Sequence, residues 1–453
     1  MQFGTVQKLI SIFNQSFHEL GVPVSLEKLE DLSVTIHRAM TVQTRHFHTL
    51  EHVFAFVDPN NAIRSLAALY HDIVYFQVDM GFSPPIWELI SPYIRQENGE
   101  FYVAENVLPE DRIVAITLDV FDLRPGQKLS SVTALNEFLS ALVMIKQLDG
   151  FVPEKDLLSM TVCIEATIPF RGYTADGKSH FDIMEERLLE IIKRYGLDIP
   201  DENVIETIKT AVIFANKDIE NFAESDPGRF LDNTWKLLPE TNAALRLPDV
   251  YTLGTYRQAL QKMDTFFRNL DVNTVFSQYR GVPSDEILSH MVHLSRNNLN
   301  IACQYLNIKI LGITILEALA KATGGDAPLS LFMGDIPRQG VSIKRIEYYL
   351  PELDDSPWVD HNSIIYQLLD SGRSSDTSFD MKNSPLSLFI YKAIPPEQIT
   401  LYLHRAQDLY RGVLSPAEFL KGIDPLIVRP IARASSIMVF TRRQALLQFA
   451  GDN

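Results

Sequence analysis

The chain has 453 residues, more than one hydrophobic core usually organises, so we expect two or three domains. Its formal charge of −16 and the absence of a basic block argue against a nucleic-acid polymer as partner. The composition, 46% hydrophobic and 22% charged, is typical of a soluble globular protein, and we expect no membrane partner. Cys163 and Cys303 lie in apolar runs. Buried free thiols suit a reducing compartment, which predicts a cytoplasmic protein.

Helical periodicity dominates the chain. The stretch 6–21 carries one broad apolar stripe and ends in glycine, and 25–40 opens on a serine N-cap. Further helical patterns cover 62–75, 130–146, 155–168, 182–195, 202–223, 255–270 and 284–322. Strand-like alternation is confined to 100–107 and 341–350. The predicted fold is therefore mostly helical, in the all-α class.

Turn-forming and polar stretches along the chain suggest that it has three parts. We expect a first domain at 1–275, a long helical segment at 276–350 and a small helical C-terminal unit at 351–453. No apolar run is expected to be long enough to span a bilayer. The helical pattern at 284–322 is compatible with a homodimer.

Two short stretches concentrate the histidines: "RHFHTLEHV" at 45–53 and "ALYHDIVY" at 68–75. His48 and His52 are four apart, so on a helix they share one face. His71 and Asp72 are adjacent within the run "IRSLAALYHDIVY", which is apolar nearly all round. An ionised carboxylate in such a place costs several kcal/mol unless it is paired or bound to a metal. A single buried histidine is more often merely hydrogen-bonded, but the combined pattern favours a metal site.

These residues resemble the "H…HD…D" signature of the HD superfamily of metal-dependent phosphohydrolases, whose fold is all-helical. "FHTLEHV" resembles the "YHN-x-x-H" stretch of cyclic-nucleotide phosphodiesterases and of compact bacterial HD phosphohydrolases. The resemblance implies that His52 is a metal ligand, that His48 donates a proton to the leaving oxygen, and that His71 and Asp72 form the metal-binding pair.

The family needs one further aspartate on another buried helix. Asp218, in "IKTAVIFANKDIENFAE", looks like the "ADISNP" segment of those phosphodiesterases. Asp119 and Asp149 are competitors for the same role. We favour Asp218 because its neighbours make the helix largely apolar.

The chain also departs from the family pattern. The stretch after Asp72, and residues 168–170, lack the acidic and histidine residues that usually hold a second metal. We therefore expect at least one divalent ion, Mn, Fe, Mg or Zn, and two are less favoured. The "HD-x-x-E-D" pattern of alarmone hydrolases is absent, which counts against that substrate.

The predicted reaction is hydrolysis of a phosphodiester or nucleotide phosphate by metal-activated water, on a small phosphorylated substrate. Arg45 and Arg171 are candidates for stabilising charge on phosphate oxygens. For Arg45, a salt bridge at the start of a helix is an equally favoured interpretation. His180 could line a substrate mouth, whereas a solvated loop residue is the commoner case. The alternative function is a non-catalytic HD-fold ligand sensor or scaffold that acts through its C-terminal helical half.

Overall fold

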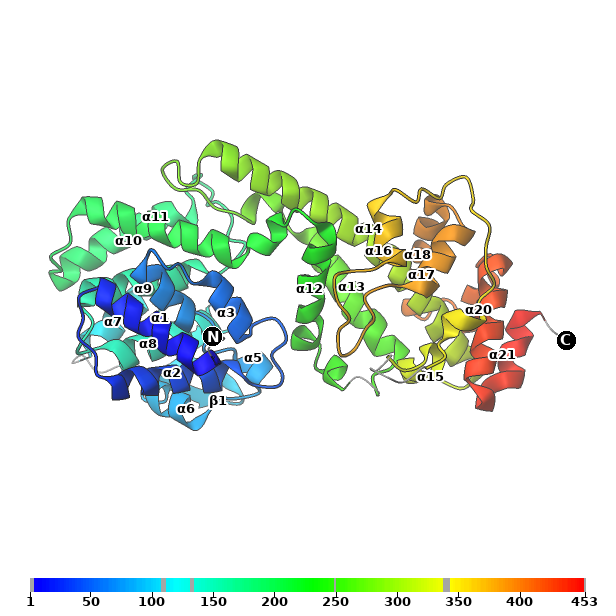
Figure 1. Ribbon diagram of the computed structural model, residues 1–453, viewed down its shortest axis with the longest axis horizontal. Helices are drawn as coiled ribbons and strands as arrows, with labels where there is room; N and C mark the ends of the chain where they lie inside the picture. Colours follow the sequence, from blue (N-terminus) through cyan, green and yellow to red (C-terminus); the bar gives the residue numbers. More distant parts are fainter. Residues whose placement is uncertain (1–3, 107–110, 131–133, 248–249, 337–342, 452–453) are drawn as a thin grey trace. The chain divides into compact units, whose positions relative to one another are not determined.

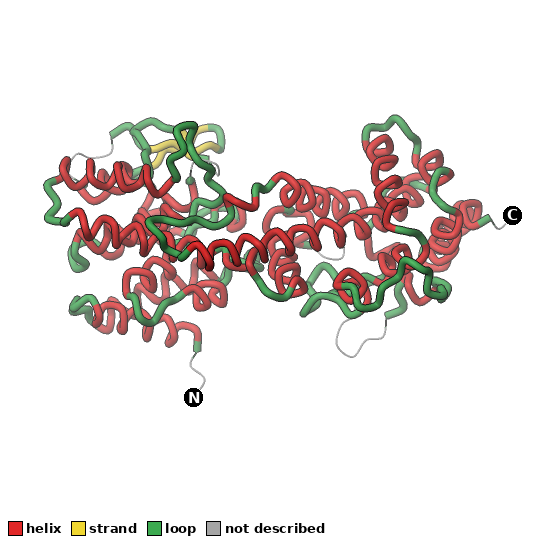
Figure 2. The backbone as a smooth tube through the Cα atoms, turned by 90° about the horizontal axis from the view of Figure 1, so that it is seen from above, coloured by secondary structure: helices red, strands yellow, loops and turns green. Residues whose placement is uncertain are grey.

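The computed structural model describes residues 4–106, 111–130, 134–247, 250–336 and 343–451. The fold is 65% helical with 3% strand, which confirms the all-α prediction (Figures 1 and 2). Among the described residues the chain divides into two compact units. Unit 1 comprises 1–221 and 271–293, and unit 2 comprises 222–270 and 294–453.

The helices of unit 1 are short to medium in length. They are α1 (Thr5–Glu19), α2 (Leu26–Met40), α3 (Leu50–Phe56), α4 (Ala62–Tyr70), α5 (Phe76–Asp79), α6 (Pro84–Ile90), α7 (Arg112–Val120), α8 (Leu135–Leu148), α9 (Glu154–Ala166), α10 (His180–Tyr195) and α11 (Asp201–Asp218). As predicted, Ser25 caps α2 by accepting a hydrogen bond from the Lys28 amide, and α1 ends before Gly21.

The core of unit 1 is built around α8 and α9, which are apolar on nearly all sides and almost fully buried. Helices α4 and α11 both pack against α9, and they also contact each other. Burial of these helices removes large apolar areas from water, and each Å² of buried apolar surface contributes about 25 cal/mol to stability. This packing places the predicted site residues inside the unit.

A small antiparallel sheet, in the order β1-β2-β3, lies in unit 1 (Figure 2). It consists of β1 (Ile94–Glu97), β2 (Glu100–Val103) and β3 (Lys128–Leu129). The strand predicted at 100–107 is thus correct for its first four residues. The one predicted at 341–350 is wrong for the described residues 343–350, which contain a 3₁₀ turn at Ile346–Tyr349 and pair with no strand.

The helices of unit 2 begin with α12 (Pro227–Thr241) and α13 (Leu253–Asn269). Helix α14 (Asp285–Thr323) belongs to unit 1 up to residue 293 and to unit 2 from there on. The later ones are α15 (Leu329–Met333), α16 (Ile364–Asp370), α17 (Pro385–Ala393), α18 (Pro396–Tyr410), α19 (Pro416–Lys421), α20 (Pro425–Met438) and α21 (Arg443–Ala450). The predicted boundaries differ from this division, because α12 and α13 belong to the second unit.

Buried charges explain why α12 and α13 group with the later helices. Trp235 of α12 donates its indole N–H to Asp380 at 2.8 Å, and Lys309 of α14 pairs with the same carboxylate at 2.9 Å. Arg257 of α13 pairs with Glu317 of α14, with both side chains buried. Pairs of this kind are costly to break, because a lone charge would remain in a dry interior.

Helix α14 is apolar enough and long enough to cross a membrane by composition alone, which corrects the expectation that no such run exists. Its most apolar window has a mean hydropathy of 1.4 and is 78% buried inside the protein. A buried core helix of a soluble protein passes the same test. The helix is accounted for by its packing in the fold.

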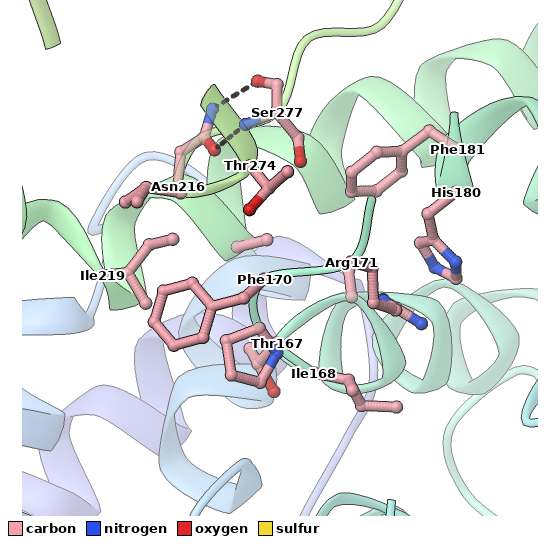
Figure 3. A pocket seen from close by; sticks show the side chains of 14 residues that line it. Thr167, Ile168, Phe170, Arg171, His180, Phe181, Asn216, Ile219, Thr274 and Ser277 are labelled. Carbon is pink, nitrogen blue, oxygen red and sulfur yellow. Dashed lines mark hydrogen bonds between the residues drawn. The ribbon is translucent and has the colours of Figure 1, made fainter. Parts of the chain in front are cut away.

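Helix α11 is tied to the segment that follows residue 270 by one side chain. The amide of Asn216 donates to the Ser277 carbonyl at 2.8 Å and accepts from the Ser277 N–H at 2.9 Å (Figure 3). Asn216 is buried and Ser277 is half-buried, so both hydrogen bonds are partly shielded from water. These two hydrogen bonds hold the end of α11 at a position two residues before Asp218.

We predict that Asn216→Ala lowers the free energy of unfolding by about 1–3 kcal/mol, because the half-buried N–H and carbonyl groups of Ser277 lose their hydrogen-bond partner. Chemical denaturation monitored by circular dichroism checks this. The matched control is Asn203→Ala, an exposed asparagine on the same helix. Equal midpoints for the two variants would contradict the prediction.

Candidate metal centre

Four side chains from distant parts of the sequence meet inside unit 1. His52 lies on α3, His71 caps the C-terminus of α4, Asp72 follows it in a turn, and Asp218 is the last residue of α11. His71 Nε2 lies 2.9 Å from an Asp72 oxygen and 3.6 Å from an Asp218 oxygen. His52 Nε2 lies 3.6 Å and 3.3 Å from oxygens of the same two carboxylates.

The donor atoms suit a shared cation. Atoms that bind one ion at about 2.1 Å and at right angles lie about 3 Å apart, and ligand atoms of His52, His71 and Asp218 all fall within 4.8 Å of one another. His52 Nε2, His71 Nε2 and one Asp72 oxygen are buried without a hydrogen-bond partner. The close nitrogen–oxygen pairs are therefore not aligned as hydrogen bonds. Buried polar atoms without partners call for an explanation, and a bound cation supplies one.

The surroundings of His71 fix which nitrogen faces the centre. Its Nδ1 lies 2.8 Å from the Ala68 carbonyl, an acceptor, so Nδ1 carries a proton. A neutral ring then has its lone pair on Nε2, as metal-binding histidines require. The rings of Phe56 and Phe214 pack against the imidazole, with centroids 4.7 Å and 6.1 Å away, and restrict its rotation.

Without an ion, the four groups must compensate one another. Burial alone would lower the pKa of His71, but Asp72 and Asp218 overcome this and raise it to about 10. Burial would raise the pKa of each aspartate, whereas the neighbouring histidines hold both below the usual range. The metal-free centre thus holds a protonated imidazole between carboxylates, and a cation would replace that proton.

His48 lies beside the four ligand candidates, but it lies in a loop and not on the helix that we expected. It belongs to the loop before α3, because that helix begins only at Leu50, so the prediction of a shared helix face with His52 is wrong. The two rings nevertheless lie 5.9 Å apart, and Tyr75 packs on His48 at 4.6 Å. The loop conformation brings the half-buried His48 next to the centre by another route.

Arg45 is a buried structural residue. Its guanidinium forms two hydrogen bonds with the Asp79 carboxylate, at 2.7 and 2.6 Å, and a third with the Asp72 carbonyl at 2.7 Å. The side chain has no exposed surface. This geometry does not support the predicted contact between Arg45 and substrate. It makes Arg45 a clamp that holds the backbone of Asp72.

Arg171 and His180 lie close together, as we expect of residues of one site. Both of them contact a third residue, Glu165. Glu165 of α9, 2% exposed, accepts from Arg171 and lies 2.8 Å from His180 Nε2. Burial alone would raise the pKa of Glu165, but Arg171 and His180 hold it below its usual range. His180 opens α10 instead of lying in a solvated loop.

Both residues line a cavity of about 20 Å³, which has room for one water or two (Figure 3). None of the four ligand candidates lines it. A larger cavity, about 380 Å³, is bordered by Phe56 and Phe214, the two rings that contact His71. The competitors for the last ligand lie elsewhere: Asp119 binds Arg194 and Tyr195, and Asp149 is exposed.

Sequence reasoning missed three acidic residues around these groups. Glu165 carried a signal, since it is an ionisable residue in the apolar run of α9, where a buried charge needs a partner. Asp79 and Glu137 carried none, because their partners are far apart in the sequence.

We predict that the free energy of unfolding of the metal-free wild type falls, relative to that of the His71→Gln variant, as the pH rises from 6 to 10. The folded-state pKa of His71 is about 10, above the unfolded value of about 6.5. The ion pair therefore contributes fully below about pH 6.5 and is lost as the pH rises through about 10. Urea denaturation in chelator at both pH values checks this. A constant difference between the two proteins would contradict it.

For the Arg45 clamp, we predict that Arg45→Ala destabilises the protein by about 3–5 kcal/mol, since it strands a buried carboxylate. In a double-mutant cycle with Asp79→Ala, the double variant should lose much less than the sum of the single losses. Denaturation midpoints provide the measurement, and additive losses would argue against the clamp.

Comparison of the chain with protein-family models, with curated proteins and with solved structures found no match.

Proposed function

We propose that this protein is a metal-dependent phosphohydrolase of the HD superfamily, acting on a phosphodiester or nucleotide phosphate. The observation that carries the proposal is that ligand atoms of His52, His71 and Asp218 lie within 4.8 Å of one another. An Asp72 oxygen lies 2.9 Å from His71 Nε2 and 3.6 Å from His52 Nε2. Three separate stretches of sequence supply these residues. The resemblance of the histidine motifs to that superfamily adds the reaction class.

The donor set narrows the choice of ion. Two imidazole nitrogens and two carboxylate oxygens suit Mn, Fe or Zn, and Mg is less favoured because it prefers oxygen ligands. Four protein ligands fill only part of an octahedral shell. When bound, such an ion would polarise the phosphoryl oxygen and lower the pKa of a water molecule.

The chain's own residues supply the remaining steps. His48, next to His52 and half-buried, would give a proton to the leaving oxygen as its bond to phosphorus breaks. Phe56 and Phe214 would exclude water behind His71 and keep the ligand rings oriented. The Arg45 clamp would hold Asp72 in place. We further propose that the protein acts in the cytoplasm on a small substrate.

A second candidate is a non-catalytic HD-fold ligand sensor or scaffold. The observation that favours it is the state of the two predicted phosphate-binding arginines. Asp79 engages Arg45, and Glu165 engages Arg171. With both guanidinium groups occupied, charge stabilisation at phosphorus would depend largely on the ion.

We predict that purified wild type binds about one divalent ion and hydrolyses bis(p-nitrophenyl) phosphate, and that Asp218→Asn loses both properties. We expect the rate to fall by about 100-fold or more, since even changes in the outer shell of a metal site cost about 10–100-fold. Metal analysis by mass spectrometry and initial rates with added Mn²⁺ are the measurements.

The matched control is Asp149→Asn, which removes an equal charge from an exposed position in the same unit. It should keep the metal content and the rate of wild type. Metal binding without hydrolysis of any phosphate ester would favour the non-catalytic candidate. Equal rates for Asp218→Asn and wild type would end the catalytic proposal.

A further inference from the structure

The cavity of about 380 Å³ in unit 1 has the size of a site for a small organic molecule. Pockets that bind such molecules usually measure about 300–1,000 Å³. All of its described lining residues belong to unit 1, and eight of these thirteen residues are apolar. The four ligand candidates, His52, His71, Asp72 and Asp218, are not among them. A molecule in this cavity would therefore be a different one from the substrate at the centre.

Two aromatic rings connect the cavity with the centre. Phe56 and Phe214, which we call the phenyl wall, border the cavity, and their ring centroids lie 4.2 Å apart. The Phe56 ring also contacts the imidazoles of His71 and His52, at centroid distances of 4.7 Å and 6.1 Å. Phe214 contacts His71 at 6.1 Å. Any molecule that packs against the phenyl wall thus acts on the side chains that hold two ligand candidates in position.

The charged groups that line the cavity balance one another. Arg64 pairs with Asp58 at 2.5 Å, and Lys217 pairs with Glu220 at 2.5 Å. These four residues carry two positive and two negative charges, so their sum is zero. A charged molecule would have to break into one of the pairs or enter without a partner, and both carry a cost in free energy. The lining therefore favours an uncharged occupant.

Ile213 gives the cavity an apolar surface that the fold leaves uncovered. It precedes Phe214 on α11 and is 39% exposed. A single exposed isoleucine is common in proteins and needs no explanation by itself. This one, however, borders a cavity whose other lining residues are mostly apolar. A molecule that fills the cavity would remove this apolar surface from water, which favours binding.

We propose that the cavity binds a small, uncharged and mainly apolar molecule, and that this molecule strengthens the binding of the ion at the centre. The second part rests on the proposed function. The bound molecule limits the motion of the phenyl wall, and the wall limits the rotation of His71. A ligand side chain that is already held loses less freedom when the ion binds. Since coupling between two sites is reciprocal, the ion strengthens binding of the molecule by the same factor.

The test uses two dyes that share one ring system. N-phenyl-1-naphthylamine is uncharged, whereas 1-anilinonaphthalene-8-sulfonate carries a negative charge, and the fluorescence of both rises in apolar surroundings. Full-length protein in chelator is titrated with each dye.

The variants change the size or the charge of one cavity residue. Ile213→Trp places a larger side chain at the cavity, and Ile213→Glu places a charge there. The matched controls are Leu189→Trp and Leu189→Glu, because Leu189 on α10 is 37% exposed and does not border the cavity. Circular dichroism checks that all four variants keep the helical fold.

The inference predicts that wild type binds the uncharged dye at one site, and more tightly than the anionic dye. Both Ile213 variants should weaken binding of the uncharged dye about tenfold or more, whereas both Leu189 variants keep the wild-type affinity. Three results would overturn the site: no binding of the uncharged dye to wild type, equal affinity in wild type and the Ile213 variants, or tighter binding of the anionic dye.

Calorimetric titration with Mn²⁺, without and with saturating uncharged dye, tests the coupling. The dye should lower the Kd for Mn²⁺ about fivefold or more in wild type and in Leu189→Trp, but not in Ile213→Trp. A Kd for Mn²⁺ that the dye leaves unchanged or raises in wild type overturns the coupling.

Failure of the proposed function gives a different result. A protein that binds no Mn²⁺, but binds the uncharged dye in a way that depends on Ile213, would overturn the metal centre and the coupling while it supports the cavity as a site. A protein that shows both the site and the coupling, yet hydrolyses no phosphate ester, would overturn the phosphohydrolase proposal alone.

Discussion

The structure of unit 1 depends on one electrostatic constraint: two carboxylates and two imidazoles share a small space in a helical core. Carboxylates in an apolar interior cost several kcal/mol each unless opposite charge compensates them. Without an ion, the proton on His71 provides that compensation, but the atoms around it are not arranged as hydrogen bonds. His71 Nε2 lies 2.9 Å from an Asp72 oxygen, yet neither of these atoms nor His52 Nε2 has a hydrogen-bond partner.

Several buried charges elsewhere in the described residues have direct partners. In unit 2, Asp380 accepts from Trp235 and pairs with Lys309, so its lone pairs are used. Arg257 and Glu317 likewise form a pair in bonding geometry. Around the centre, Arg45 and Glu165 are also satisfied by several partners. In the His52–His71–Asp72–Asp218 group, three buried atoms without hydrogen-bond partners lie close together, and this clustering supports the proposal of a bound cation.

The sequence allowed the helical class and most of the long helices to be predicted, because apolar periodicity in α1, α2, α10 and α13 reflects one buried face. The pair of a carboxylate and a histidine within an apolar run pointed to His71 and Asp72, and the resemblance to the HD superfamily added His52 and Asp218 as expected ligands. The domain boundaries were not accessible in this way. Helices α12 and α13 join unit 2 through Trp235 and Arg257, whose partners lie 60 to 145 residues away.

The finer features of the site depend on such distant contacts too. Periodicity extended the helix at 62–75 beyond Tyr70, whereas the chain turns at His71, and this turn directs both His71 and Asp72 inward. The role of Arg45 followed from Asp79, 34 residues further on. The packing of α8 against the segment after Asp72 depends on Ser140 and Asn136, whose partners lie 66 and 60 residues away. No local pattern encodes these approaches.

The most direct test of the central claim is a crystal structure of the protein grown with Mn²⁺, with diffraction data collected at the manganese absorption edge. The account predicts a strong anomalous peak within bonding distance, about 2.0–2.3 Å, of His52 Nε2, His71 Nε2 and oxygens of Asp72 and Asp218. Absence of a peak at millimolar Mn²⁺, with the four side chains hydrogen-bonded to one another, would contradict it.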